Sequence, residues 1–381
     1  MNIKNCFHMI FLSFLLIASD CGPKSDTSPR SIYYSICVDE NWENLPSLEQ
    51  ADRENKFKVL VLPFAFRKHV AGFINDFIKA LESEGWDIVD AETQVISHDP
   101  VADIQKATGK NGVPDIVAFY ILRGRTLDMW NTLADQEFAK VLIVEDIHFL
   151  DDLISARRFA EFGSAFFVRY PEAFSNAIYP KVPAHVFSLY HAASAKFFAI
   201  EDNQSRISKA LLSGAVHPSY YPLRVAAVKL IEGNFGLIEH YVHPGYGIVD
   251  PVKTQEAYIE TIKKYKIAIA GMVYGPELYA PYVIAKHFEI PATGTPMITD
   301  ELLEPFLQKI GFIKNVNYIA ASSENLKQTI EYWLKPENEA QLKQIGQKGY
   351  DLVKAKHTLD ARVKMFDETC LKVHKLKASK Y

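Results

Sequence analysis

The chain has 381 residues, which is too long for one ordinary small domain and enough for two. Its residues are 48% hydrophobic and 23% charged, close to the averages of soluble globular proteins, so general disorder is excluded. With 18 glycines and 19 prolines, collagen-like and low-complexity classes are also excluded. The net charge of −4, without a basic block in the body of the chain, argues against a nucleic-acid partner.

The four cysteines do not form a recognisable pattern. Cys6, Cys21, Cys37 and Cys370 lie far apart, and no C-x-x-C pair occurs. Their spacing suits neither a disulfide framework nor a zinc site, so we expect ordinary thiols.

A hydrophobic segment, residues 7–18, lies near the amino terminus. At 12 residues it is too short for a transmembrane helix, which needs about 20, but it suits the core of a signal peptide. Cys21 follows as in a bacterial lipoprotein, although Asp20 stands where that family has a small residue and His8 interrupts the core. A signal and a short anchor at the membrane surface remain alternatives. We treat residues 1–55 as leader and extension, and favour the cytoplasm or the cytoplasmic face of the membrane.

From Lys58 onward, short runs of β-forming residues alternate with segments of helical spacing. The first predicted strand, residues 58–63, precedes a predicted helix at 70–84, which Gly85 ends. Further strands are predicted at 86–89, 115–122, 140–146, 165–170 and 183–189, with helices near 127–138 and 150–162. This alternation is typical of parallel β-α-β units.

A second β/α series follows the polar stretch at 201–208. Its predicted strands are 210–216, 235–240, 267–270, 296–299 and 318–321, its helices 221–231, 253–264 and 279–290, and the final helices 323–333, 337–356 and 359–376. Two series of similar size predict an α/β fold with two Rossmann-like domains, 56–205 and 206–381, facing each other across a cleft. Ligands are then expected beyond the carboxyl ends of the strands.

The motifs of several enzyme classes are absent from the sequence. No Walker loop, H-E-x-x-H, G-x-S-x-G or G-x-G-x-x-G follows a predicted strand. The absence of the last motif argues against a nicotinamide dehydrogenase.

The most informative stretch is residues 285–298, AKHFEIPATGTPMI. It predicts the end of a helix that carries Lys286 and Glu289 one turn apart, with a stop at Pro291 and Gly294. A carboxylate in this place can accept two hydrogen bonds from a ribose diol, and a nearby ammonium can bind a phosphate. On spacing alone, a surface ion pair at a helix end is slightly favoured.

The same stretch resembles the C-terminal signature of GT-B glycosyltransferases, in which the Glu of E-A-x-A-x-G-x-P binds the nucleotide ribose. The chain is most similar to the CgeB/YkvP-like, spore-maturation type, and the resemblance continues through residues 316–326, 330–334, 345–349 and 356–362. It covers roughly the last hundred residues well and 209–270 loosely. The resemblance implies that Glu289 binds the ribose and that Gly294 and Thr295 contact the donor through their backbone.

The activity implied by this resemblance is hexosyl transfer to a hydroxyl of a glycan, lipid or protein, with a nucleotide-diphosphate sugar as donor. Residues 56–205 would present the acceptor and residues 206–381 would hold the donor, with no metal and no further cofactor. No D-x-D, the metal-binding motif of the other major class, occurs in the sequence. Many GT-B enzymes carry a second Glu where this chain has Pro281, which puts a two-carboxylate mechanism in doubt.

Four other polar residues follow predicted strands. Arg224, near a helix start, either clamps a diphosphate or covers the helix surface. His243 either lines the cleft or makes a turn with the Pro-Gly pair after it, and the turn is slightly favoured. Asp146 and His148 are candidate bases for the acceptor hydroxyl, although Asp146 is equally well a helix cap.

Two other functions remain open on the sequence alone. One is an exported two-domain solute-binding lipoprotein, which the leader and Cys21 would suit. The other is a degenerate transferase that acts as an interaction module. The basic tail, Lys372, Lys375, Lys377 and Lys380, is expected to be a solvated end rather than a contact with anionic lipid.

Overall fold

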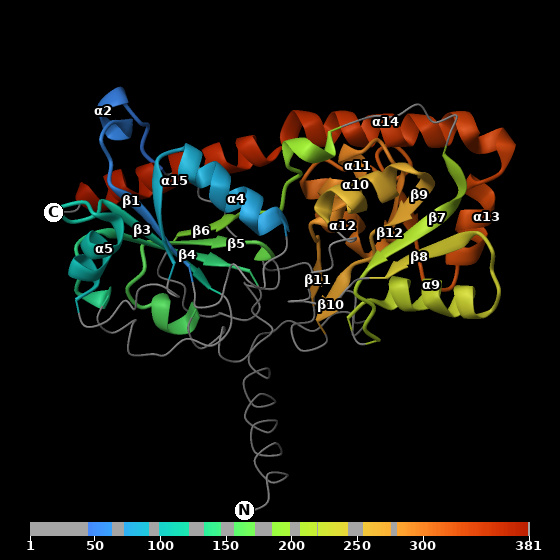
Figure 1. Ribbon diagram of the computed structural model, residues 1–381, viewed down its shortest axis with the longest axis horizontal. Helices are drawn as coiled ribbons and strands as arrows, with labels where there is room; N and C mark the ends of the chain where they lie inside the picture. The colour runs from blue at the N-terminus through green and yellow to red at the C-terminus, as the bar shows by residue number, and fades with distance from the viewer. Residues whose placement is uncertain are drawn as a thin grey trace, which may run out of the picture. The chain divides into compact units, whose positions relative to one another are not determined.

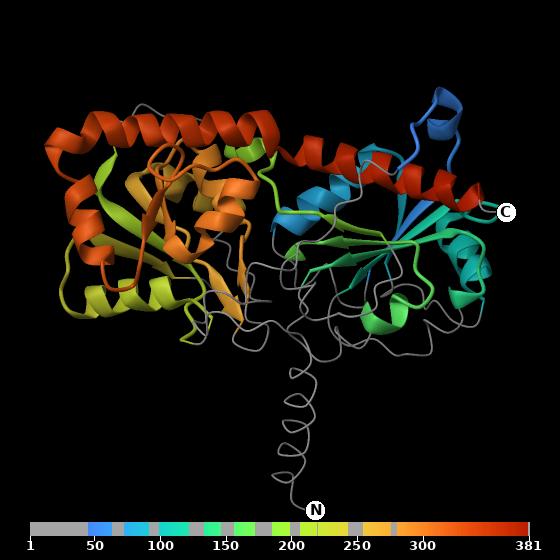
Figure 2. The same ribbon diagram turned by 180° about the vertical axis from the view of Figure 1, so that it is seen from behind.

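The computed structural model describes residues 45–62, 72–90, 99–121, 133–145, 156–171, 185–198, 206–218, 220–242, 254–275 and 280–379 (Figures 1 and 2). Within these residues the chain forms two parallel sheets with helices between their strands, and one antiparallel hairpin. The predicted α/β class with two Rossmann-like sheets is therefore confirmed.

The first sheet has six parallel strands in the order β2-β1-β3-β4-β5-β6. They are β1 (Lys58–Leu62), β2 (Trp86–Asp90), β3 (Ile116–Ile121), β4 (Ala139–Val144), β5 (Ala165–Val168) and β6 (His185–Ser188). In register, Lys58 of β1 lies opposite Trp86 on one side and Ile116 on the other. The inner strands are nearly continuous apolar runs because helices cover both faces of the sheet.

Successive residues of a strand point to opposite faces, and this alternation builds two cores around the first sheet. Leu60 and Leu62 pack with α4 (Gly72–Ser83), whereas Val59 and Val61 pack in the cluster that contains Ile104. Ile104 comes from α5 (Pro100–Thr108), which Asp99 caps and Gly109 ends. The short helix α2 (Gln50–Arg53) precedes β1.

The second sheet has five parallel strands in the order β13-β12-β9-β7-β8. They are β7 (Ile207–Gly214), β8 (Ile238–Val242), β9 (Tyr265–Ile269), β12 (Met297–Asp300) and β13 (Ile319–Ala321). The helices α9 (Pro222–Glu232) and α13 (Leu326–Trp333) cover one face, and α10 (Gln255–Lys263), α11 (Lys286–Ala292) and α12 (Glu304–Lys309) cover the other (Figure 1). Short 3-10 helices are η3 (Ala195–Phe197), η5 (Glu301–Leu303) and η6 (Pro336–Asn338).

The predicted helix over residues 279–290 is wrong in its first half. Residues Ala280–Tyr282 form β11, which pairs antiparallel with β10 (Val273–Gly275), and α11 begins only at Lys286. The β-forming run Tyr282-Val283-Ile284 favours extended backbone, and Pro281 is tolerated in a hairpin strand that has one partner.

The end of α11 also differs from the prediction. Lys286 and Glu289 lie in the first turn of this short helix, not at its end, and Pro291 lies inside it. Gly294, with φ of 71°, takes the left-handed conformation just after the helix, as expected for the residue that stops it.

The chain ends in two long helices, α14 (Glu339–Lys356) and α15 (Leu359–Ala378). Val363, Phe366 and Cys370 of α15 belong to the same apolar cluster as β1 and α4, so α15 packs on the first sheet (Figure 2). The division at 205/206 stays a prediction, but by its packing α15 belongs with the first sheet.

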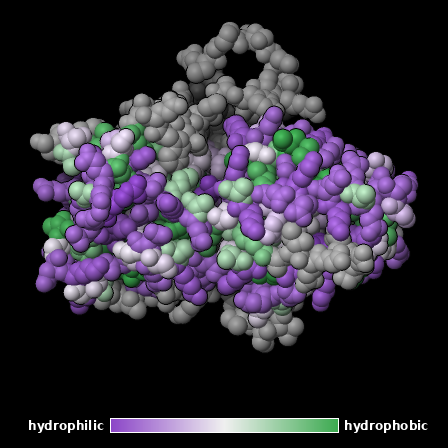
Figure 3. Space-filling model, turned by 90° about the horizontal axis from the view of Figure 1, so that it is seen from above, coloured by the Kyte–Doolittle hydropathy of each residue, from purple (hydrophilic) through white to green (hydrophobic). Residues whose placement is uncertain are grey.

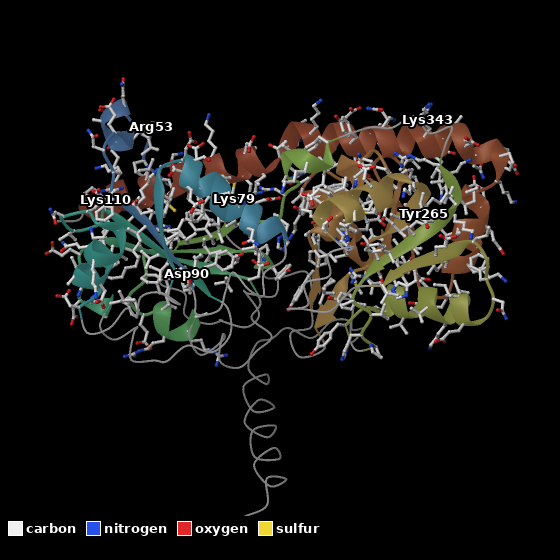
Figure 4. The ribbon with its side chains drawn as sticks, in the orientation of Figure 1. Arg53, Lys79, Asp90, Lys110, Tyr265 and Lys343 are labelled. Atoms are coloured by element: carbon white, nitrogen blue, oxygen red, sulfur yellow. The ribbon has the colours of Figure 1, made fainter. Side chains whose placement is uncertain are left out.

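The expectation of a solvated basic end is wrong for two of its lysines. Lys375 donates to the Ser47 carbonyl and to Asp52, and Lys377 donates to the carbonyls of Glu137 and Phe138. Arg53 of α2, which is labelled in Figure 4, pairs with Glu368 of α15 in the same region. On the face seen in Figure 3, hydrophilic residues predominate and hydrophobic ones are scattered. None of the described helices is long and apolar enough to cross a bilayer.

Candidate functional site

The structure describes five of the predicted site residues: Arg224, Lys286, Glu289, Gly294 and Thr295. The other three, Asp146, His148 and His243, lie outside the described residues. Their assignments stay predictions.

Arg224 and Lys286 meet at the carboxyl end of β7. A Cβ built on Gly214, the last residue of β7, would lie 2.8 Å from Cε of Lys286 and 3.0 Å from Nη1 of Arg224. Gly214 has φ of 95°, a conformation that favours glycine, so the strand end leaves room for both cations. Ligands of parallel α/β sheets bind at this edge.

Arg224 is fixed in an inward orientation. Its Nε donates to the carbonyl of Ala270, just after β9, and its Nη1 donates to the carbonyl of Ala215, just after β7, both at 2.9 Å. The guanidinium also lies 4.1 Å from the ring centre of Tyr221. At 2% exposure it does not cover the outer surface of α9; instead it adds a fixed positive charge at the two strand ends.

Lys286 contacts a residue that the sequence analysis missed. Its Nζ donates to the hydroxyl of Tyr258 in α10 at 2.5 Å and lies 4.2 Å from the centre of that ring. Burial lowers the pKa of Lys286 to about 8; the charge of Glu289 opposes this effect and that of Arg224 adds to it. The sequence did contain a signal for Tyr258, because it precedes Ile259 in a predicted helix. Ile259 belongs to the apolar core, and Tyr258 packs against that core.

Glu289 is a buried carboxylate, 7% exposed. Among the described residues, no hydrogen bond or ion pair engages its oxygens. Burial raises its pKa, the charge of Lys286 lowers it, and that of Asp76 raises it. A buried carboxylate is costly without donors, so Glu289 is well suited to accept hydrogen bonds from a ligand.

His287, between these two residues, anchors the first turn of α11. Its Nδ1 accepts from the backbone N–H of Ile284 at 3.0 Å, and its Nε2 lies 2.8 Å from Oγ1 of Thr299 in β12. Burial lowers the pKa of His287 to about 3, so the ring is neutral. No pattern in the sequence marks His287, but its contacts orient the helix that carries Lys286 and Glu289.

Gly294 and Thr295 lie apart from these groups. The Thr295 hydroxyl accepts a 2.5 Å hydrogen bond from Arg206. Arg206 also donates to the carbonyl of Tyr265, the residue labelled in Figure 4 at the start of β9. Arg224, in contrast, bonds to the carbonyl just after β9. Because α11 runs back along the sheet from Lys286, its last turn reaches the amino ends of the strands, about 10 Å away at 1.5 Å per residue.

A second buried polar cluster lies at the carboxyl ends of β3, β4 and β5 in the first sheet. Glu145 lies 3.2 Å from Nε of Arg169 and 3.3 Å from Nε2 of His191, and it accepts a hydrogen bond from Tyr120. Burial, together with the charge of Arg169, lowers the pKa of His191 well below its usual value. Glu145 is therefore engaged in holding strand ends together, unlike Glu289. The residue predicted from the sequence is its neighbour Asp146.

Metal ligands are not gathered in the described part of the chain. No three side chains among its His, Cys, Asp and Glu residues come close enough together to hold an ion. The expectation of a metal-independent site stays a prediction.

Comparison with protein families places a glycosyltransferase-like segment in the second half. The family described as "Glycosyl transferase-like" matches residues 236–368, which include Lys286 and Glu289. No curated protein sequence matches the chain.

Solved structures of similar fold are glycosyltransferases. Sucrose-phosphate synthase from Thermosynechococcus elongatus has a TM-score of 0.55 and 11% identity, covering 84% of this chain and 100% of its own. Anabaena Alr3699/HepE in complex with UDP-glucose has a TM-score of 0.54 and 11% identity, covering 81% and 98%. An alpha-glucosyltransferase in complex with UDP-glucose and DNA has a TM-score of 0.54 and 10% identity, covering 83% and 100%. The chain therefore has the GT-B fold.

Proposed function

We propose that this chain is a glycosyltransferase that moves a sugar from a nucleotide-diphosphate sugar to a hydroxyl of a glycan, lipid or protein. Its GT-B fold and the glycosyltransferase-like segment over residues 236–368 support this function over a solute-binding lipoprotein. The observation that carries the proposal is Glu289, a buried carboxylate with uncommitted oxygens among the described residues, beside Lys286.

In this proposal Glu289 binds the ribose of the donor, and Lys286 and Arg224 both act on its diphosphate. Glu289 accepts hydrogen bonds from the ribose diol. Lys286 and Arg224 stabilise the negative charge that develops on the leaving nucleoside diphosphate. Because the Alr3699/HepE structure and the alpha-glucosyltransferase structure contain UDP-glucose, uridine nucleotides are the first donors to test.

The finer assignments rest on the sequence. The CgeB/YkvP-like type remains our closer family assignment, with Asp146 and His148 as candidate bases on the acceptor side and His243 as a further donor contact. Two cations at the strand ends supply positive charge without a metal or cofactor. We place the protein in the cytoplasm or on the cytoplasmic membrane face, with the segment at 7–18 as its means of reaching that surface, and expect no nucleic-acid partner.

The test is titration calorimetry of UDP and other nucleoside diphosphates with wild-type protein and the Glu289→Gln variant. The variant is expected to bind the preferred nucleotide tenfold to a hundredfold more weakly, the size expected for hydrogen bonds to a charged group. Its melting temperature should stay the same or rise, since the substitution removes a buried charge.

The matched control is Glu232→Gln, at the exposed end of α9, which should bind nucleotide as the wild type does. Unchanged affinity in Glu289→Gln would refute the role of Glu289. Nucleotide binding by the wild type without turnover of any activated sugar would favour the degenerate transferase instead.

A further inference from the structure

Tyr258 and Lys286 join two helices beside the carboxyl end of β7. The Lys286 ammonium donates to the Tyr258 hydroxyl at 2.5 Å, and that hydroxyl lies 3.5 Å from Oγ of Ser213 in β7. Since the hydroxyl accepts from Lys286, its own proton is free to be donated to Ser213. Tyr258 of α10 therefore links Lys286 of α11 to Ser213 of β7.

The position of the ammonium is constrained from several sides. The ring of Tyr258 lies beneath it, and Gly214 lies against its Cε carbon, where a Cβ would be only 2.8 Å away. A lysine side chain otherwise loses about 2 kcal/mol of rotamer entropy when it is held in one conformation. In this site the protein has already fixed the side chain before any ligand arrives, which favours binding.

The charges around Lys286 indicate what it is held to receive. Arg224 of α9 lies beside Lys286 at Gly214, because a Cβ on that glycine would be 3.0 Å from Nη1 of Arg224 and 2.8 Å from Cε of Lys286. Glu289, three residues after Lys286 in α11, is near enough for its charge to raise the pKa of the lysine. Tyr241 of β8 lies next to Tyr258, with ring centres 6.2 Å apart. Asp76, whose charge also acts on Glu289, is itself paired with Lys196 at 3.2 Å. Arg224 and Lys286 against Glu289 therefore leave a local positive excess, which suits phosphate oxygens better than an uncharged ribose or base.

We propose that Tyr258 is a positioning residue of the donor site: its hydroxyl holds the Lys286 ammonium where the diphosphate of the nucleotide sugar binds. The proposal rests on the function proposed above and adds a residue to it. One ammonium hydrogen goes to the tyrosine, and the other two are directed toward the phosphate oxygens. Tyr258 therefore contributes to recognition of the diphosphate, not of the nucleoside.

The test uses Tyr258→Phe, which removes the hydroxyl and keeps the ring, with UDP and uridine as probes. UDP affinity, measured by calorimetry, is expected to fall about tenfold, as for the loss of one hydrogen bond to a charged group. Uridine affinity, measured by ligand-observed NMR, is expected to stay within twofold of wild type. A merely structural role would weaken both ligands together.

Tyr350→Phe is the matched control, because Tyr350 of α14 also accepts a hydrogen bond from a lysine, Lys354, at 3.3 Å and lies under its ammonium. This variant should bind both probes as the wild type does. Equal UDP affinity in Tyr258→Phe and wild type, or an equal loss for UDP and uridine, would overturn the inference. Failure of the wild type to bind either probe would instead count against the proposed uridine-nucleotide donor.

Discussion

Arg362 donates a hydrogen bond to Nδ1 of His357 across 3.1 Å, between the end of α14 and the first turn of α15. The other ring nitrogen of His357, Nε2, donates to the carbonyl of Ile310 at 2.9 Å. Only the neutral ring with its proton on Nε2 satisfies both contacts, because a proton on Nδ1 would face the guanidinium. Burial and the charge of Arg362 accordingly lower the pKa of His357 to about 4.

This arrangement predicts acid sensitivity of the fold. In the unfolded chain the histidine pKa is about 6.5, so the unfolded state binds the proton first as pH falls. The stability contributed by neutral His357 is present above about pH 6.5 and is lost as pH falls toward 4, by up to about 1.4 kcal/mol per pH unit. Urea denaturation at pH 7.5, 6.0 and 5.0 measures this slope.

The His357→Gln variant isolates the contribution of this residue. The free energy of unfolding of the variant at pH 7.5 measures the packing lost with the ring. Between pH 6.0 and 5.0, this free energy should change less steeply with pH than in the wild type, by the amount that corresponds to about one fewer proton bound on unfolding. His287, with a pKa of about 3, keeps its share of the slope in the variant. A variant with the full wild-type slope would contradict the role given to His357.

Asp367 connects α15 to the first sheet and predicts a large loss of stability on truncation. It accepts from Nζ of Lys58 at 2.6 Å and from Nε1 of Trp86 at 2.8 Å, and Lys58 is 8% exposed. Asp367→Ala leaves a buried ammonium without its counter-ion, so the free energy of unfolding should fall by about 3–5 kcal/mol. Chemical denaturation measures the change.

The neighbouring residue provides the control for this variant. Glu368 pairs with Arg53 at 3.0 Å, but both side chains are substantially exposed, so Glu368→Ala should cost less than about 1 kcal/mol. Similar losses in the two variants would contradict the difference between the buried and the exposed pair.

The sequence predicted most of the fold because its strands and helices have strong periodicity. Buried runs such as Val59–Leu62 and helices such as α15 were expected within a few residues of their observed bounds. The hairpin of β10 and β11 was missed because its strands have only three residues each, too short for a period to appear. The segment around Tyr282 was consequently assigned to the following helix.

The site was only partly predictable from sequence. Glu289 and Lys286 were selected because they are close in sequence and their spacing is informative. Tyr258 was missed because it contacts Lys286 only through the packing of α10 and α11, from 28 positions away. The donor contacts expected from the backbone of Gly294 and Thr295 stay a prediction. The direction of α11 across the sheet, which no local pattern encodes, places Thr295 at the other end of the strands, where it accepts a hydrogen bond from Arg206.

Gly346 of α14 packs against the turn after α11, and its replacement should disturb that turn. A Cβ at this position would lie 2.4 Å from the carbonyl oxygen of Gly294 and 3.0 Å from the ring of Pro296. Alanine gains about 1 kcal/mol over glycine in a helix interior, but the overlap with backbone outweighs this gain. We expect Gly346→Ala to lower the free energy of unfolding by about 1–3 kcal/mol and to weaken UDP binding through the displaced α11.

Thermal unfolding and calorimetry of the same sample measure both effects. Gly236→Ala is the control, because no atom lies within 4 Å of a Cβ at that position. If Gly346→Ala had the same free energy of unfolding as the wild type, α14 could move away from the turn after α11 without loss of stability, and the predicted overlap would be wrong.

Donor binding should depend on pH through Lys286, whose pKa of about 8 is set mainly by burial. Its ammonium attracts the diphosphate only when protonated, and a bound diphosphate in turn favours the protonated form. UDP affinity should therefore fall as pH rises through 8, by at most tenfold per pH unit. Burial raises the pKa of Tyr258 far above this range, so the tyrosine does not titrate with it.

Lys286→Arg separates this effect from a general loss of binding at high pH, because a guanidinium stays charged throughout. Calorimetry between pH 6.5 and 9.5 should show that, above pH 8, UDP affinity stays constant in the variant and falls in the wild type. Circular dichroism verifies that both proteins remain folded over this range. Because arginine is larger and loses the contact with Tyr258, its affinity changes for other reasons as well, and the shape of the pH profile is the diagnostic quantity. An equally steep decrease of UDP affinity with pH in both proteins would assign the titration to a group other than Lys286.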